Sequence, residues 1–116
     1  METHISVLPI IDVKSFDQTV QSHAAVVIQA WVSWDPACRH LDAWLRQNRD
    51  GYTNLRFYAM DIDQEQNRPF AVEWAIATTP TLICIHDGAF HERQVGLRPK
   101  PQMSAKLSEW NSLSGG

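Results

Sequence analysis

Residues 24–39 read Ala-Ala-Val-Val-Ile-Gln-Ala-Trp-Val-Ser-Trp-Asp-Pro-Ala-Cys-Arg and join two elements of different kinds. The segment from Ala24 to Val32 is apolar except for Gln29, which is typical of a central strand covered on both faces. Asp35 is a good helix N-cap, because its carboxylate can accept hydrogen bonds from the unpaired amides of the first turn. Pro36 then falls at the first helical position, where a missing N–H costs nothing. The stretch therefore predicts a buried strand that runs directly into a helix.

Hydrophobic periodicity and turn signals predict alternating strands and helices along the rest of the chain. Asp87-Gly88 is typical of a tight hairpin turn between two antiparallel strands. The other predicted strands are 5–11, 55–62, 81–85 and 90–95. The other predicted helices are 13–22, 66–75 and a last one that carries Met103, Leu107 and Trp110 on one face. The helix that begins after Asp35 is predicted to end before Asp50-Gly51. The order β-α-β-α-β-α-β-β-α predicts an α/β fold, with a central mixed sheet of about five strands flanked by about four helices.

Length and composition are those of one globular domain, which we expect to span residues 1–116 with 112–116 as a frayed tail. The formal net charge is −3 and no basic stripe is present, so nucleic acid is not an expected partner. The longest apolar run, from Ala24 to Ile28, is too short to cross a bilayer, so no membrane association is expected. The N-terminus lacks the basic and apolar regions of a signal peptide, which favours a cytoplasmic location.

Metal and cofactor sites are not expected either. The chain has two cysteines, which are too few for a zinc site by themselves, and its five histidines show no ligand-like spacing.

Three motifs, in the right order and spacing, resemble the thioredoxin family over nearly the whole chain. Residues 28–39 lie where the family carries a strand running into its Trp-Cys-Gly-Pro-Cys-Lys site. Residues 76–82, Ile-Ala-Thr-Thr-Pro-Thr-Leu, are similar to the family's Ile-Pro-Thr-Leu segment, whose proline is cis and faces the redox site. Asp87-Gly88 and Val95-Gly96 are similar to the turn and the glycine loop before the last helix. The resemblance implies a thioredoxin fold.

The resemblance also implies that three linked redox positions have changed. Asp35 stands in place of the first cysteine, which the helix macrodipole activates as the attacking thiolate; a carboxylate cannot exchange with a disulfide. Cys38 matches the second, resolving cysteine. Gln29 occupies the place of a buried aspartate that assists proton transfer to that thiol, and Ala59 the place of a nearby lysine. We therefore expect an atypical former redox site, Trp-Asp-Pro-Ala-Cys, made of Trp34, Asp35, Pro36, Ala37 and Cys38.

The individual side chains have alternative interpretations. Asp35 is interpreted as a helix cap rather than a catalytic acid, because no second titratable group is placed to share proton transfer with it. Cys38 is either a small, inert, buried side chain or a thiol that forms mixed disulfides with partners or glutathione. Cys84 lies well into a strand, away from Pro80, so we expect it in the core and not bonded to Cys38.

In the family's relatives, the loop before the cis proline offers backbone groups to an extended peptide. The resemblance implies the same shallow groove here, with a protein or an extended peptide as its partner. The expected groove residues are Trp34, Thr79, Pro80, Val95 and Gly96. Trp34 has the alternative of packing over the helix start, whereas Trp31, Trp44, Trp74 and Trp110 stand at core-like positions.

Three functions follow as hypotheses. The first is a redox-inactive or redox-impaired binding or chaperone-like module, which is not an enzyme because it lacks the paired cysteines of a dithiol–disulfide oxidoreductase. The second is a monothiol oxidoreductase or thiol sensor that works through mixed disulfides of Cys38, with an external thiol to resolve them. The third is a purely structural subunit of a larger assembly.

Overall fold

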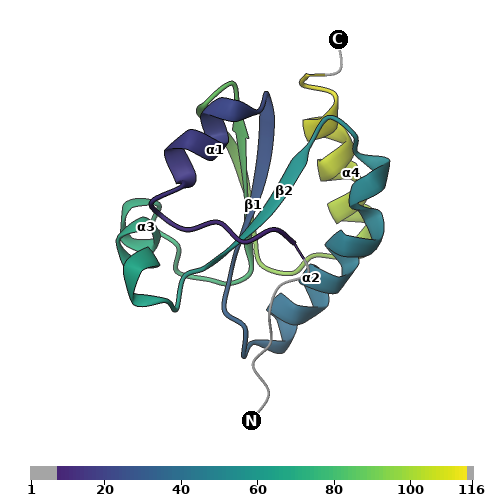
Figure 1. Ribbon diagram of the computed structural model, residues 1–116. Helices are drawn as coiled ribbons and strands as arrows, with labels where there is room; N and C mark the ends of the chain where they lie inside the picture. Colours follow the sequence, from purple (N-terminus) through teal and green to yellow (C-terminus); the bar gives the residue numbers. More distant parts are fainter. Residues whose placement is uncertain (1–7, 115–116) are drawn as a thin grey trace.

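A four-stranded mixed sheet lies between two pairs of helices in the computed structural model, which describes residues 8–114 (Figure 1). The strand order is β2-β1-β3-β4; β1 pairs parallel to β2 and antiparallel to β3, and β4 pairs antiparallel to β3. The strands are β1 (Ala25–Trp31), β2 (Arg56–Asp61), β3 (Thr81–His86) and β4 (Ala89–Val95). The helices are α1 (Phe16–Ser22), α2 (Pro36–Asn48), α3 (Arg68–Glu73) and α4 (Lys100–Asn111), with short 3₁₀ turns η1 (Arg49–Gly51) and η2 (Glu65–Asn67). The predicted α/β architecture is confirmed.

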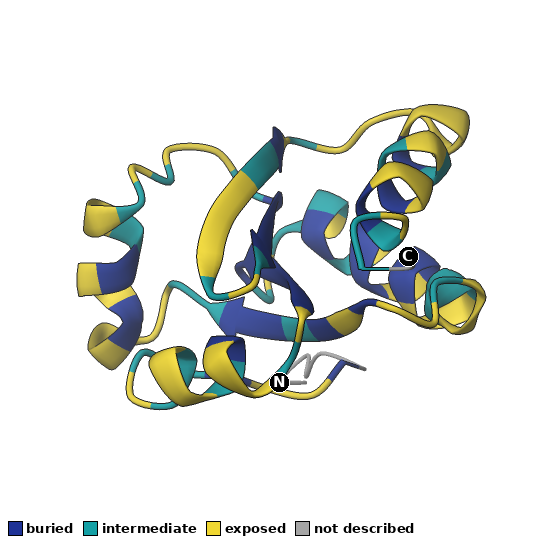
Figure 2. Ribbon diagram, turned by 90° about the horizontal axis from the view of Figure 1, so that it is seen from above, coloured by how far each residue is buried: buried dark blue, intermediate teal, exposed yellow. Residues whose placement is uncertain are grey.

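Each face of the sheet supports its own apolar core. Helices α2 and α4 cover one face, where Leu41 and Leu107 are fully buried against strand residues. Helices α1 and α3 cover the other, where Val20 and Phe70 pack against β1 and β3. In Figure 2 each of these helices presents a buried stripe inward and an exposed stripe outward, which is the expected pattern for an amphipathic helix on a sheet.

The central strand behaves as its composition predicts. All seven residues of β1 are buried, because it has a strand on each side and a helix layer on each face. Its polar member, Gln29, pairs in register with Ala59 of β2 and Leu82 of β3. Residues in register share a face, so these three side chains lie on the side of α2 and α4.

The strand expected at 5–11 lies partly outside the described residues. Within them, Ile10 forms a single parallel bridge with Ala59 of β2. The amide of Ile11 donates to the carbonyl of Ala59, and the amide of Ala59 donates to the carbonyl of Pro9, both at 2.9 Å. This segment therefore covers part of the outer edge of β2.

Helix α1 begins later than the sequence pattern predicts. The expected start was Val13, but Asp12 and Ser15 form a reciprocal turn in which the Ser15 amide donates to Asp12 Oδ1 at 2.9 Å. These side-chain hydrogen bonds keep the backbone of this segment in a turn, so the helix begins only after it. Val13 still packs against the core of that face, so its apolar character is explained by burial rather than by helix.

The β3–β4 hairpin turns at Asp87 and Gly88, both with positive φ (52° and 80°), as expected for a two-residue turn. Of the tail expected to fray, 112–116, residues 115 and 116 lie outside the described residues. Leu113 instead donates its amide to Trp110 and packs against the core.

Glu92 links β4 to α4. Its carboxylate accepts from Trp110 Nε1 at 2.9 Å and from Lys106 Nζ at 2.8 Å, and Trp110 is fully buried. Hydrogen bonds from Lys106 and then from Trp110 lower the pKa of the Glu92 carboxyl.

Replacing Glu92 should therefore destabilise the fold. Glu92→Ala is expected to lower the free energy of unfolding by about 1–2 kcal/mol near neutral pH, because the buried Trp110 N–H loses its acceptor. The matched control Glu109→Ala removes only an exposed partner of Lys106 and should cost less than about 0.5 kcal/mol. Urea denaturation measures both.

Because the folded pKa of Glu92 is lowered, its contribution to stability is complete above the pKa of an unfolded glutamate and is lost as the pH falls through the folded value. If the difference in the free energy of unfolding between wild type and Glu92→Ala grew as the pH fell, this expectation would be contradicted.

Candidate functional site

The sheet topology brings the expected site residues together at one end. The carboxyl end of β1 lies beside the start of β3, where Ala30 pairs with Thr81, and Thr81 pairs in turn with Val95 at the end of β4. The amide of Gly96 donates to the carbonyl of Pro80 at 2.8 Å. The β1–α2 junction, the Thr79-Pro80 loop and the loop after β4 are therefore neighbours.

The Asp35 carboxylate joins two of these segments. Oδ1 accepts from the Ala37 amide at 2.9 Å, which confirms the predicted cap of α2, an interaction that contributes about 1 kcal/mol relative to alanine. Oδ2 accepts from the Thr79 hydroxyl at 3.3 Å and from the Cys38 thiol at 3.5 Å. One side chain thus caps a helix and holds the loop before Pro80 against it.

Cys38 is completely buried. Burial raises the pKa of its thiol to about 11; hydrogen bonds from the Val32 backbone and from Thr79 act in the opposite direction, and the charge of Asp35 adds to the rise. Cys84 is also buried, with a thiol pKa of about 12, again because of burial, and both cysteines are free. Both thiols are protonated at neutral pH, which favours the inert interpretation of Cys38.

Gln29 lies directly behind Cys38. It is fully buried, and its Nε2 donates to the Cys38 carbonyl at 3.2 Å. Among the described residues, its Oε1 has no hydrogen-bond partner, nor does the indole Nε1 of buried Trp31 two residues along the same strand. Gln29 and Ala59, which pairs with it on β2, carry no ionisable group that could accept a proton from Cys38.

Trp34 is largely exposed beside the start of α2. Its side chain is 66% exposed, and its Nε1 donates to Asp63 Oδ2 at 3.3 Å. Asp61 Oδ1 accepts from the amide of Asp63 at 2.9 Å, so the two acids form one turn at the end of β2. Sequence reasoning did not assign these two acids to the site. The order of the elements could have indicated them, because parallel strands such as β1 and β2 place their carboxyl ends at the same edge of the sheet.

The loop before β3 leaves main-chain groups free. The Thr79–Pro80 peptide bond is cis, Pro80 is buried, and the Thr81 hydroxyl donates to the Thr78 carbonyl at 2.6 Å. Within the described part of the chain, the structure gives the main-chain N–H and C=O of Thr79 no hydrogen-bond partner.

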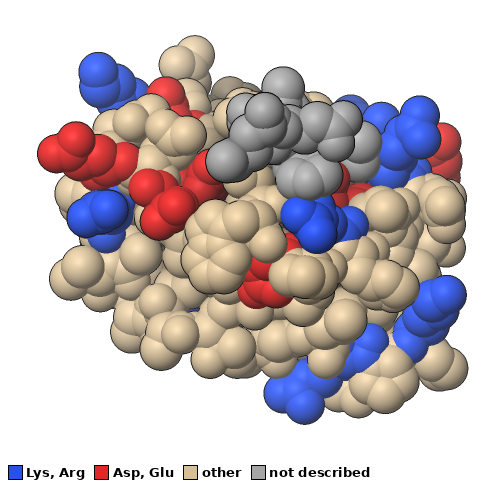
Figure 3. Space-filling model, turned by 90° about the horizontal axis from the view of Figure 1, so that it is seen from below, with Lys and Arg blue, Asp and Glu red and all other residues tan. Residues whose placement is uncertain are grey.

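Apolar side chains continue across the neighbouring loop. Val95 and Leu97 are 38% and 41% exposed, and Gly96 between them has a φ of 80°, which only glycine adopts readily. Figure 3 looks at the molecule from the side on which α2 begins; most of this face is uncharged, with Asp and Glu mainly toward one side and Lys and Arg mainly around the rim.

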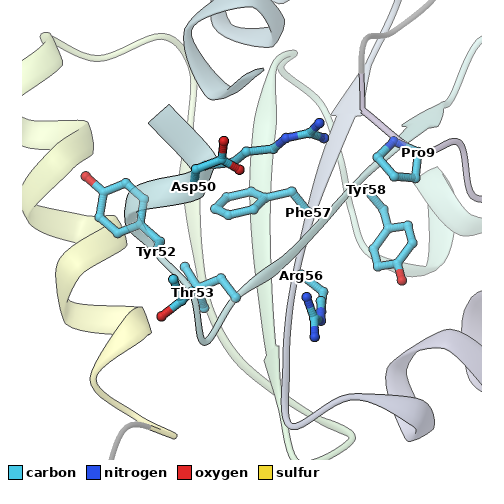
Figure 4. A pocket seen from close by; sticks show the side chains of 9 residues that line it. Pro9, Asp50, Tyr52, Thr53, Arg56, Phe57 and Tyr58 are labelled. Atoms are coloured by element: carbon cyan, nitrogen blue, oxygen red, sulfur yellow. The ribbon is translucent and has the colours of Figure 1, made fainter. Parts of the chain in front are cut away.

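A separate hollow of about 390 Å³ lies beside β2 and contains none of the expected site residues. In Figure 4 the ring of Phe57 lies between Tyr52 on one side and Tyr58 and Pro9 on the other. The lining is completed by Arg49, Asp50, Thr53, Leu55 and Arg56.

A comparison with protein families matches residues 7–109 to the thioredoxin family model. The chain belongs to the thioredoxin family. Among its relatives, the thioredoxin of Acidithiobacillus ferridurans is 30% identical over 95 residues, covering 80% of this chain and 86% of that protein. The thioredoxin of Chlorobaculum thiosulfatiphilum is 28% identical over 93 residues, covering 79% of this chain and 84% of that protein.

Solved thioredoxin structures share the fold. A Plasmodium falciparum thioredoxin superposes with a TM-score of 0.80 at 15% identity, over 89% of this chain and 99% of that one. The Malassezia sympodialis thioredoxin superposes with a TM-score of 0.78 at 22% identity, over 96% and 99% of the two chains. The expected thioredoxin fold is confirmed. Among the described residues, no helix is long and apolar enough to span a bilayer, and no cluster of side chains is suited to hold a metal ion.

Both thiols of this thioredoxin-family chain should resist alkylation while it is folded. With iodoacetamide at about pH 8, mass spectrometry is expected to find Cys38 and Cys84 unmodified in the native protein and modified in urea, because the thiolate is the reactive form. Free glutathione in the same tube is the control for reagent activity. Labelling of native Cys38 as fast as in the unfolded chain would contradict a buried, protonated thiol.

Proposed function

We propose that this member of the thioredoxin family is inactive in dithiol–disulfide exchange and acts as a binding module for an extended segment of a protein partner. The proposal depends chiefly on one observation: the carboxylate of Asp35 caps α2 and bonds to Thr79 at the place where the family resemblance expects the attacking cysteine. An oxygen anion there stabilises the helix but cannot attack a disulfide.

The remaining sulfur chemistry is also unfavourable. Exchange by a dithiol needs a second thiol within bonding reach of Cys38. Cys84 is not placed for this, because it lies beyond Leu82 along β3, away from Pro80, and pairs in register with Val27; both cysteines are free. The alternative of a monothiol enzyme needs an accessible thiolate at Cys38. Its complete burial and its thiol pKa of about 11 weigh against that alternative.

Binding is supported by the groups that the site leaves open. The main chain of Thr79 offers an N–H and a C=O for the backbone of an extended peptide, as in strand addition. Trp34 on one side and Val95 on the other are exposed apolar side chains that could pack against the residues of such a peptide. These groups favour the groove of Trp34, Thr79, Pro80, Val95 and Gly96 over a purely structural role.

Restoring one sulfur should restore part of the redox chemistry. The wild-type protein is expected not to accelerate insulin reduction by dithiothreitol, whereas Asp35→Cys is expected to form a disulfide with Cys38 and to accelerate it, because a thiol at a helix N-terminus gains thiolate character. Thiol counts and insulin turbidity measure the two effects. The control Asp35→Ser keeps a capping oxygen without sulfur and should stay inactive. A wild-type rate typical of dithiol thioredoxins would overturn the proposal.

The groove can be tested with a library of random peptides of about ten residues, long enough to add one strand. Peptides selected on the wild-type protein are expected to bind Trp34→Ala about tenfold more weakly, because an exposed tryptophan that becomes buried is a typical interface anchor. Fluorescence anisotropy measures the affinities. The control Val72→Ala removes an 81% exposed side chain from α3 and should leave the affinities unchanged. Failure to select any peptide, or equal binding of the peptides by wild type and Trp34→Ala, would contradict the proposed binding groove.

A further inference from the structure

The exposed indole of Trp34 has three acidic residues near it, one bonded to it directly and two close in the turn or in the chain. Asp63 accepts from its Nε1, Asp61 accepts from the amide of Asp63, and Asp35 follows Trp34 directly in the chain. None of the three takes part in the ion pairs found among the described residues, which involve only Asp87, Glu92 and Glu109 as acids. Arg39, one helical turn after Asp35, forms no ion pair with it within residues 8–114. Within residues 8–114, none of these carboxylates therefore has a paired cation.

An exposed indole beside carboxylates is a good site for a cation. The face of a tryptophan attracts ammonium and guanidinium groups, and a carboxylate adds charge-assisted hydrogen bonds. The bond from Nε1 to Asp63 already fixes the orientation of the ring, so little ordering remains to be done when a ligand arrives.

The opposite side of the groove has a different character. Val95 and Leu97 present apolar surface, and the Nε of Arg98 donates to the Val95 carbonyl at 2.9 Å. The Trp34 side of the groove is thus aromatic and acidic, whereas the other side presents Val95 and Leu97 with Arg98 beside them. In Figure 3 the Asp and Glu side chains gather toward one side of the face on which α2 begins.

We propose that the segment bound in this groove carries a lysine or arginine whose charged group lies against Trp34 and pairs with Asp63 and Asp61. The inference deepens the proposed function and rests on it, since it specifies the charge of the bound segment. A basic segment complements both the unpaired carboxylates and the indole, whereas an acidic one at the same place would face like charges.

The same peptide library distinguishes the two proposals. Peptides selected on the wild-type protein are expected to be enriched in Lys and Arg at one position. The double variant Asp61→Asn/Asp63→Asn is expected to show a clearly weaker enrichment, because Asn keeps the accepting oxygens and removes the charge. The matched control Asp17→Asn/Asp87→Asn removes two exposed acids from α1 and from the β3–β4 turn, and it should keep the enrichment.

Affinities then test the contact directly. Replacing the selected Arg by Leu should weaken binding to wild type by about three- to tenfold, because a cation–π contact and an ion pair are lost together. It should weaken binding to the double variant clearly less, because that variant keeps Trp34 but has no carboxylate to pair with the Arg. The difference should shrink at high salt. Peptides that depend on Trp34 but show no basic enrichment would overturn this inference and leave the proposed function standing. A library that yields no Trp34-dependent peptide would overturn both.

Discussion

The site depends on the place of β1 between a parallel and an antiparallel neighbour. Because β1 is buried on both faces and paired on both edges, its carboxyl end has one position in the molecule. The parallel pairing brings the end of β2, with Asp61 and Asp63, beside Trp34. The antiparallel pairing brings the start of β3, with Thr79 and Pro80, to the other side. Segments far apart in the sequence therefore meet where α2 begins.

At that junction the carboxylate of Asp35 joins two segments by hydrogen bonds. Asp35 satisfies an amide of the first turn of α2, and it also accepts from Thr79 and from the thiol of Cys38. Its neighbours agree with this assignment, because Gln29 behind Cys38 is neutral and Ala59 opposite has no functional group. The polar atoms here position the loop, and burial keeps the thiol of Cys38 protonated at neutral pH.

Much of this arrangement could be predicted from the sequence. The continuous apolar run of β1, the Asp-Pro cap of α2 and the Asp-Gly turn are local signals, and each has a local physical cause. The start of α1 was predicted too early, because Asp12 and Ser15 bond to each other, and periodicity does not report such a turn. The exposure of Trp34 and its bond to Asp63 depend on strand pairing between residues about thirty positions apart, which no local pattern contains. The burial of Cys38 likewise follows from the packing of α2 on the sheet and not from its neighbours in the chain.

A disulfide at the start of α2 would exist in two states, and the surface around it would change with the thiol–disulfide balance of the compartment. The bond between Asp35 and Thr79 has no such second state, because a carboxylate neither gains nor loses electrons under those conditions. The hydrogen bond that joins the start of α2 to the Thr79-Pro80 loop therefore does not itself depend on the redox potential of the surroundings.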